Sequence, residues 1–169
     1  FQACSNLVSV LISDDVTTIN HYAFHKCYSL ETIILPNNIT FIGALSFGIC
    51  SKLKTVKLPE KLTLIHNFMF NYCDSLNTIK IPDSVTVFGR YCFRWCHNLI
   101  SIDMPDTVRT IGEGSFLDCP RLKTFHFPKS LTKIRENTFR YCRSFTSITI
   151  PSNIVLIEQQ AFDLCENLN

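Results

Sequence analysis

The chain has 169 residues, of which 46% are hydrophobic, and its formal net charge is +2. This composition supplies enough apolar side chains for one continuous core, and the small net charge argues against nucleic-acid binding, which needs a basic stripe. No apolar run reaches the roughly 18 to 20 residues of a membrane-spanning helix, so the sequence predicts no membrane span in this segment.

A phenylalanine recurs every 23 residues along the whole chain, and a cysteine follows each one three residues later. Such a short, fixed period is typical of a solenoid, in which each turn buries its apolar side only by stacking on its neighbours. We expect one domain over residues 1–169 with seven repeats and a partial eighth, and we expect it to be part of a longer chain. The two columns are Phe1, Phe24, Phe47, Phe70, Phe93, Phe116, Phe139 and Phe162, and Cys4, Cys27, Cys50, Cys73, Cys96, Cys119, Cys142 and Cys165.

The elements follow one another in a constant order within each repeat. Apolar residues first alternate, as at Ile33 and Leu35, which is typical of a strand with these side chains inward. Proline then ends the strand at Pro36 and at five equivalent positions, because it lacks an N–H group. A turn and a shorter extended piece with Ile39 and Ile42 come next. The Phe-x-x-Cys segment closes the repeat, and we expect it to form a short helical turn.

Equivalent strands one repeat apart must run parallel, and parallel crossovers are right-handed almost without exception. The sequence therefore predicts an α/β solenoid with a parallel β-sheet on its concave face. Short helical, 3-10 or extended turns are expected on the other side.

The repeat resembles that of the BspA-like (Treponema-type) leucine-rich repeat proteins. The closest local match to their pattern is LETIILPNNITFIGALSFGIC, residues 30–50, and the resemblance covers the whole chain. It implies a right-handed leucine-rich-repeat superhelix that acts as a protein–protein interaction scaffold. The namesake proteins of this subfamily imply a second role, adhesion at a cell surface.

The cysteine column is the main sequence indication of the compartment. Its regular spacing predicts buried, unpaired thiols that pack as small apolar groups, and parallel stacking suits disulfide geometry poorly. An intact column of thiols is typical of a reducing compartment, which favours the cytoplasm. The resemblance favours the cell surface as the alternative.

The sequence gives no sign of catalytic chemistry. Its five histidines fall at different repeat positions or in distant repeats, and no Ser/His/Asp, Cys/His or metal-ligand cluster is indicated. There is also no glycine-rich phosphate loop. We expect no enzyme activity, no metal and no cofactor.

Three outward columns on the strand side are candidates for partner binding. One is an unbroken series of serines and threonines. These residues suit a pleated surface, and the alternative is that they recognise a ligand. The other two bring apolar residues next to basic ones. An acidic protein segment would compensate the repulsion between neighbouring lysines, and simple solvation of the long side chains is the alternative. The candidate partner-binding residues are Leu11, Ile34, Lys54, Lys57, Lys80, Lys123 and His126.

A second candidate surface lies on the Phe-x-x-Cys side of the repeat. Two positions four residues apart carry large apolar groups there, and they would face outward together if the segment were helical. Such a patch is typical of an interface for self-association or for another domain, and the alternative is that the rings pack back over the core. Its residues are Tyr22, Leu45, Ile49, Phe68, Tyr72, Tyr91 and Trp95.

Taken together, these features predict a non-catalytic scaffold that binds a protein partner, as an intracellular adaptor or regulator in signalling or the cytoskeleton. A cell-surface adhesin that binds host or matrix proteins is the alternative. A third interpretation is a structural module that only spaces other domains.

Overall fold

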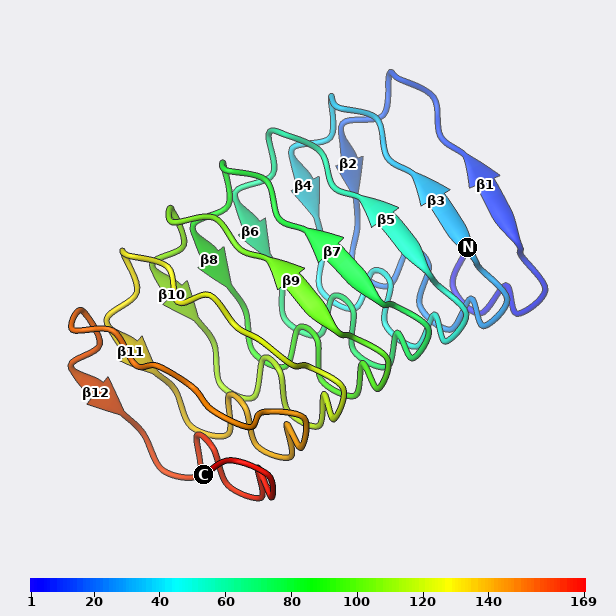
Figure 1. Cartoon of the computed structure of the whole chain (residues 1–169). Coiled ribbons are helices and arrows are strands. Elements are labelled where there is room, and N and C mark those ends of the chain that lie inside the picture. Colours follow the sequence, from blue (N-terminus) through cyan, green and yellow to red (C-terminus); the bar gives the residue numbers. More distant parts are fainter.

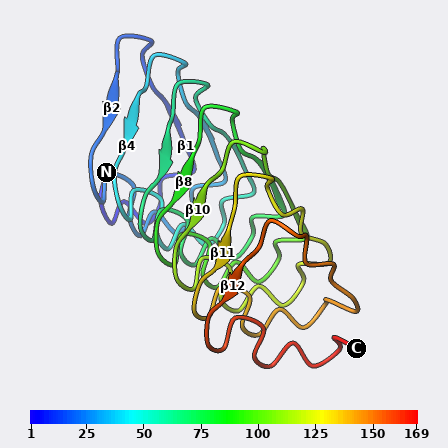
Figure 2. The ribbon, with the colours of Figure 1, turned by 90° about the vertical axis from the view of Figure 1, so that its left-hand side faces the viewer.

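The computed structural model describes all residues, 1–169, and shows a stack of similar turns that carry two rows of short parallel strands (Figure 1). Figure 2 shows the turns one behind another, with the second row of strands along one side of the stack. The predicted parallel β-solenoid is confirmed. The long-strand row is β1 (Ser9–Leu11), β3 (Thr32–Ile34), β5 (Thr55–Lys57), β7 (Thr78–Lys80) and β9 (Ser101–Asp103). The short-strand row is β2 (Thr18–Ile19), β4 (Phe41–Ile42), β6 (Leu64–Ile65), β8 (Val87–Phe88), β10 (Thr110–Ile111), β11 (Lys133–Ile134) and β12 (Leu156–Ile157).

The 23-residue period sets the register between repeats. In the long-strand row, Ile33 of β3 lies opposite both Val10 of β1 and Val56 of β5. The pairing forms a β1-β3-β5 sheet and a separate β7-β9 pair. Because every pair joins equivalent positions, each column of the sequence becomes a straight line of side chains along the stack.

The phenylalanine column is the axis of the core. Successive rings from Phe1 to Phe162 are stacked, with centroids 5.2 to 5.7 Å apart and planes within 15° of parallel. Cys27 and the later column cysteines are buried, whereas Cys4 is exposed, and all nine cysteines of the chain are free. The Cys50 thiol donates to the Phe24 carbonyl oxygen at 3.1 Å, and the same link recurs along the stack. The thiol column therefore joins each repeat to the one before it.

The Phe-x-x-Cys segment is not helical, and this part of the sequence prediction is wrong. Two tight turns replace the helix: the Ala23 amide donates to the Asn20 carbonyl, and the Cys27 amide donates to the Phe24 carbonyl. Tyr22 and Lys26, the third residues of these turns, both have φ near +61°. Alternate amides of the segment, such as that of Phe24, donate to the next repeat. Hydrogen bonds between repeats thus take the place of the bonds inside a helix.

The long-strand row ends earlier than the sequence pattern predicts. Residues 124–126 and 147–149 align with the strands but form none. Phe125 occupies an inward column that holds valine or isoleucine elsewhere, and its ring lies 4.7 Å from that of Phe139.

Candidate functional site

The outward side of β1, β3, β5, β7 and β9, called here the long-strand face, begins with an exposed apolar corner. Leu11 and Ile34 lie opposite each other in the β1–β3 register, and their side chains are 89% and 71% exposed. Val8 is 56% exposed at the entrance of the first strand. A shallow groove of about 480 Å³ runs along this corner between Leu11, Ile34 and Pro36. The predicted apolar corner is therefore present and open to solvent.

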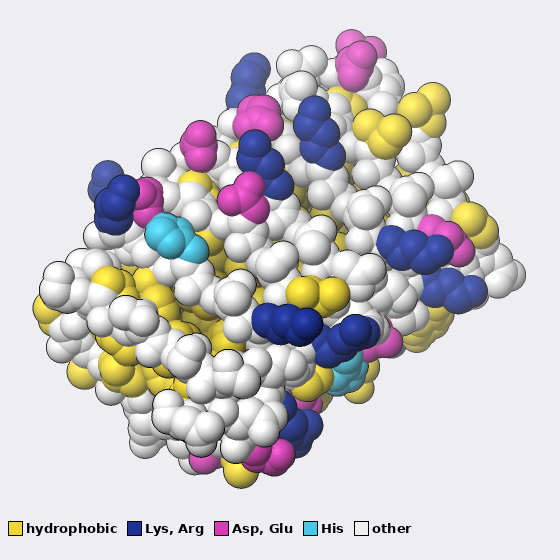
Figure 3. Space-filling model, in the orientation of Figure 1, with side chains coloured by type: hydrophobic (Ala, Val, Ile, Leu, Met, Phe, Trp, Pro, Cys, Tyr) yellow, Lys and Arg dark blue, Asp and Glu magenta, His cyan; other side chains and the backbone are white.

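Two lysines continue the same column of side chains. Ile34 lies opposite Lys57 in the β3–β5 register, and Lys57 and Lys80 line a common hollow of about 280 Å³ with Glu60. Neither ammonium group has a carboxylate within 4.0 Å. Figure 3 shows exposed hydrophobic side chains near the β1 end of this face, followed by basic ones. The structure thus brings Leu11, Ile34, Lys57 and Lys80 together.

Lys54 differs from the other two lysines because it has a partner. Its Nζ lies 2.8 Å from Glu31 Oε2 across β3 and β5. The hydrogen bond from Lys54 lowers the pKa of the Glu31 carboxyl group. The charge of Lys54 is therefore paired with that of Glu31. The sequence suggested a cluster of three unpaired lysines on this face, and the structure leaves two of them, Lys57 and Lys80, without an ion-pair partner.

Lys123 and His126 lie further along the stack, in the part where the long-strand row has ended. His126 Nε2 lies 3.1 Å from Asp106 Oδ1, and Lys129 Nζ lies 2.6 Å from Asp106 Oδ2. Hydrogen bonds from Lys129 and His126 lower the pKa of Asp106 to about 2. His126 thus belongs to a separate charged group, and Lys123 is exposed without an ion-pair partner.

The serine and threonine column runs along the centre of the long-strand face. Ser9, Thr32 and Thr55 lie opposite one another in register, as do Thr78 and Ser101. The first four members of the column are exposed. The face therefore has a row of small hydroxyl groups beside the larger side chains of Leu11, Ile34 and the lysines.

The apolar positions on the turn side lie at the surface, although no helix places them there. Tyr22 and Tyr72 are 44% and 38% exposed, whereas Leu45, Ile49 and Phe68 are half-buried. All of them have φ between +57° and +63°. They point outward because each is the left-handed residue of a tight turn.

The aromatic rings on the turn side contact one another between repeats. Phe68 and Tyr91 are stacked with centroids 5.3 Å apart, and Tyr72 and Trp95 are tilted at 4.6 Å. The Arg94 guanidinium carbon lies 3.4 Å from the centre of the Trp95 ring. Much of this aromatic surface is thus covered by its neighbours, and its use as an interface stays a prediction.

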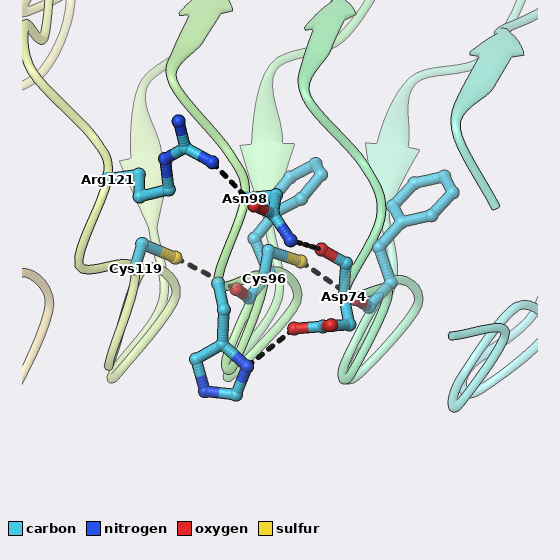
Figure 4. A network of polar contacts seen from close by, with 8 residues as sticks. Asp74, Cys96, Asn98, Cys119 and Arg121 are labelled. Atoms are coloured by element: carbon cyan, nitrogen blue, oxygen red, sulfur yellow. Dashed lines mark hydrogen bonds and ion pairs between the residues drawn. The ribbon is translucent and has the colours of Figure 1, made fainter. Parts of the chain in front are cut away.

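Polar side chains next to the cysteine column also join repeats (Figure 4). His97 Nδ1 lies 2.6 Å from Asp74 Oδ1, the Asn98 amide donates to the Asp74 carbonyl at 2.8 Å, and Arg121 donates to Asn98 Oδ1 at 2.8 Å. Each contact joins one repeat to the next. No group of three or more His, Cys, Asp or Glu side chains is placed to hold a metal ion.

Sequence reasoning missed one feature of the long-strand side. A hollow of about 260 Å³ lies where the strands have ended, between Phe125, His126, Phe127, Thr149 and Pro151. The available signal was the replacement of aliphatic residues by phenylalanine at two inward positions of one repeat.

The model of the BspA type leucine rich repeat region matches residues 1–100 and 86–169, in six copies. The chain belongs to this family. This match confirms the resemblance that the repeat pattern indicated. Leucine-rich repeats are in general protein-binding scaffolds. A comparison with curated proteins gives no match for this BspA-type chain.

Solved structures share the fold over nearly the whole BspA-type chain. A leucine-rich repeat protein from Bacteroides ovatus has a TM-score of 0.92 and 28% identity over 97% of this chain. The T. pallidum leucine-rich repeat protein has a TM-score of 0.91 and 28% identity over 96% of this chain. The chain spans 45% of the first protein and 78% of the second.

A third similar structure is that of a cell surface protein. It is a leucine rich cell surface protein from Faecalibacterium prausnitzii, with 29% identity, a TM-score of 0.58, and coverage of 98% of this chain and 59% of that one. The BspA-type chain itself has no helix with the length and apolar character needed to cross a membrane.

Proposed function

We propose that this chain is a non-catalytic scaffold that holds a protein partner on its long-strand face. The observation that supports the proposal is the exposure of Leu11 and Ile34 beside the unpaired Lys57 and Lys80. Contiguous exposed apolar side chains usually mark an interaction site. A neighbouring charge of one sign favours a partner of the opposite sign and speeds its association.

The bound segment of the partner would carry acidic side chains next to an apolar side chain. Lys57 and Lys80 line one hollow with Glu60, and neither ammonium group lies within 4.0 Å of a carboxylate. Acidic side chains on the bound segment would therefore relieve their repulsion. An apolar side chain on the same segment would lie in the groove of Leu11 and Ile34. Lys54 contributes less, because Glu31 already neutralises it.

We assign this scaffold to a cell surface, where it would act as an adhesin for host or matrix proteins. The similarity to the F. prausnitzii cell surface protein supports this assignment. The thiol column is compatible with it, because burial raises the pKa of Cys50 to about 12 and the pKa values of Cys73 and Cys96 well above their usual range, which keeps the nucleophilic thiolate form scarce.

An intracellular adaptor is the second candidate, and the nine free cysteines favour it. The two are distinguished by labelling intact source cells with an antibody against this chain. Labelling without permeabilisation supports the surface assignment. Labelling that requires permeabilisation contradicts it and selects the adaptor.

Binding to the long-strand face is tested with two double variants and a matched control. Immobilised wild-type protein is compared with Leu11→Ser/Ile34→Ser and with Lys57→Glu/Lys80→Glu for retention of extracellular-matrix and serum proteins. Lys26→Glu/Lys133→Glu makes the same charge change at exposed positions outside this face, in a turn of the Phe-x-x-Cys segment and in β11. We expect both test variants to bind a retained partner at least about tenfold more weakly than wild type does, which is a difference of about 1.4 kcal/mol in binding free energy. Equal retention by all four proteins would contradict the proposed face.

A further inference from the structure

The five histidines of the chain form two groups along the stack. His97 and His126, in the later repeats, each face an aspartate, at 2.6 and 3.1 Å. The other three have no carboxylate within 4.0 Å and lie in the first three repeats, residues 1–69: His21, His25 and His66. A proton taken up by the later histidines is therefore compensated by a neighbouring negative charge, and a proton taken up by the first three is not.

Two of the uncompensated histidines contact each other beside the short-strand row. The ring centroids of His21 and His66 are 5.8 Å apart, and the Phe41 ring contacts both, at 5.8 and 5.1 Å. The Ala44 amide donates to His21 Nδ1 at 2.8 Å, so this nitrogen carries no proton. Protonation of both rings would place two positive charges together and would turn a donor of His21 towards the Ala44 amide.

The third histidine is enclosed on the turn side of the first repeats. His25 is 9% exposed, and its Nδ1 atom has no hydrogen-bond partner. The Tyr22 ring packs edge-on against it, with centroids 5.5 Å apart. Lys26 is the charged neighbour that acts on this ring, and it has the same sign as a protonated histidine. Protonation of His25 would therefore enclose a charge that no carboxylate balances.

Burial makes the neutral form of these histidines the more stable one. It lowers the pKa of His25, an effect that the charge of Lys26 increases and the Gly48 backbone partly offsets. Burial also lowers the pKa of His66, and the neighbouring His21 adds to the effect. Histidines of an opened chain ionise at about pH 6.5, so in mild acid the opened repeats bind more protons than the closed ones. The free energy that keeps these repeats closed should consequently fall as the pH falls through this range.

We propose that the three histidines are a pH-sensitive switch that loosens the first three repeats in mild acid and thereby weakens binding at the long-strand face. The same repeats carry Leu11, Ile34 and Lys57, which are neighbours only while β1, β3 and β5 stay in register. The inference rests on the proposed protein-binding function and names its regulation. A partner is held at neutral pH and released in acid.

The size of the effect follows from proton linkage. Between about pH 7.5 and about pH 5.5, an opening that frees one neutral histidine becomes about tenfold more populated, because the freed ring ionises at about pH 6.5. A histidine that is partly protonated in the closed repeats contributes less. We therefore expect the three together to raise the opened population by at least about fivefold.

The first test is amide hydrogen exchange of the free protein at these two pH values, for which the repeat supplies matched control amides. The amides of Thr40 and Gly43 donate to the preceding repeat. Those of Arg109 and Gly112 make the equivalent bonds three repeats later. Relative to the intrinsic rate at each pH, protection of the first pair should fall at least about fivefold in acid, and that of the second pair less than about twofold. An equal change in both pairs, or no change in the first, would overturn the inference.

The second test replaces the histidines with residues that the chain itself uses. Asparagine stands at the same repeat position in another repeat for each of them: Asn67 for His21, Asn71 for His25 and Asn20 for His66. Asn67 Oδ1 also accepts the Arg90 amide, as His21 accepts that of Ala44. His21→Asn/His25→Asn/His66→Asn should therefore fold and lose the pH dependence of Thr40 and Gly43. The matched control His97→Asn/His126→Asn should keep it. Persistence of the pH dependence in the triple variant would show that other groups cause it and would refute the switch.

The third test measures binding with a synthetic peptide that carries two glutamates beside a leucine. Its glutamates stay ionised at both pH values. We expect wild type to bind it at least about threefold more weakly in acid and the triple variant to bind it equally at both pH values. Equal binding by wild type at both pH values would overturn the control of the face. Absence of binding at both pH values would instead contradict the proposed face, and the exchange of Thr40 and Gly43 would still decide whether the switch exists.

Discussion

Gly114 gives a quantitative test of the turn geometry between the phenylalanine and cysteine columns. It has φ of +58°, as do the larger residues at the same position of other repeats, and a Cβ at this residue would overlap the Tyr91 ring. The left-handed conformation costs an L-residue about 1 to 2 kcal/mol. To make room, Tyr91 must leave its stack on Phe68 and its hydrogen bond to Glu113. Each of these contacts contributes about 0.5 to 1.5 kcal/mol.

Gly114→Ala should therefore lower the free energy of unfolding by about 2 to 5 kcal/mol. The two causes are separated by repeating the substitution in a Tyr91→Ala background, where only the conformational cost of about 1 to 2 kcal/mol remains. Urea unfolding, followed by Trp95 fluorescence and by circular dichroism, measures both values. An equal loss in the two backgrounds would refute the overlap with Tyr91, and no loss in either would refute the left-handed conformation.

Two further predictions concern the thiols and the turn-side rings. Burial raises the pKa values of Cys50 and Cys92 to about 12, whereas the thiols of the unfolded chain ionise near 9. Above pH 9 the unfolded state therefore binds fewer protons than the folded state. The free energy of unfolding should consequently fall as the pH rises from 9 towards 12. A urea midpoint that holds steady over this range in wild type, or that falls equally in a Cys50→Ala/Cys92→Ala variant, would contradict this cause. For the turn side, Tyr72→Ser/Trp95→Ser should lower the sedimentation mass if these rings mediate self-association. An unchanged mass together with unchanged partner binding would assign them to packing over the core.

The sequence was sufficient for the features that depend on period alone. The inward columns, the ends of the strands at proline and the outward columns all follow from a spacing of 23 residues, because equivalent residues stack directly. The neighbours Leu11, Ile34 and Lys57 could be placed side by side for the same reason. The Glu31–Lys54 ion pair could also have been found, since its members are one period apart.

The features that sequence reasoning missed depend on conformation and volume. Tyr22 and Leu45 adopt positive φ although neither is a glycine, so their side chains gave no warning against a helix. Gly114, at the equivalent position of a later repeat, was the available signal. The loss of pairing at residues 124–127 coincides with phenylalanines at the inward positions 125 and 127, and a hydrophobic pattern does not distinguish these rings from aliphatic side chains.

The hydrogen bonds from each repeat to the next have a mechanical consequence. A tension applied at the two ends would load the contacts between neighbouring repeats, such as those of Cys50 and Phe24. One repeat could then detach while the rest of the stack stays intact, because each turn depends only on its neighbours. Every detached repeat would release a tether of roughly 80 Å, the extended length of its residues. A scaffold of this kind would lengthen in equal steps under load and keep a bound partner on the repeats that remain.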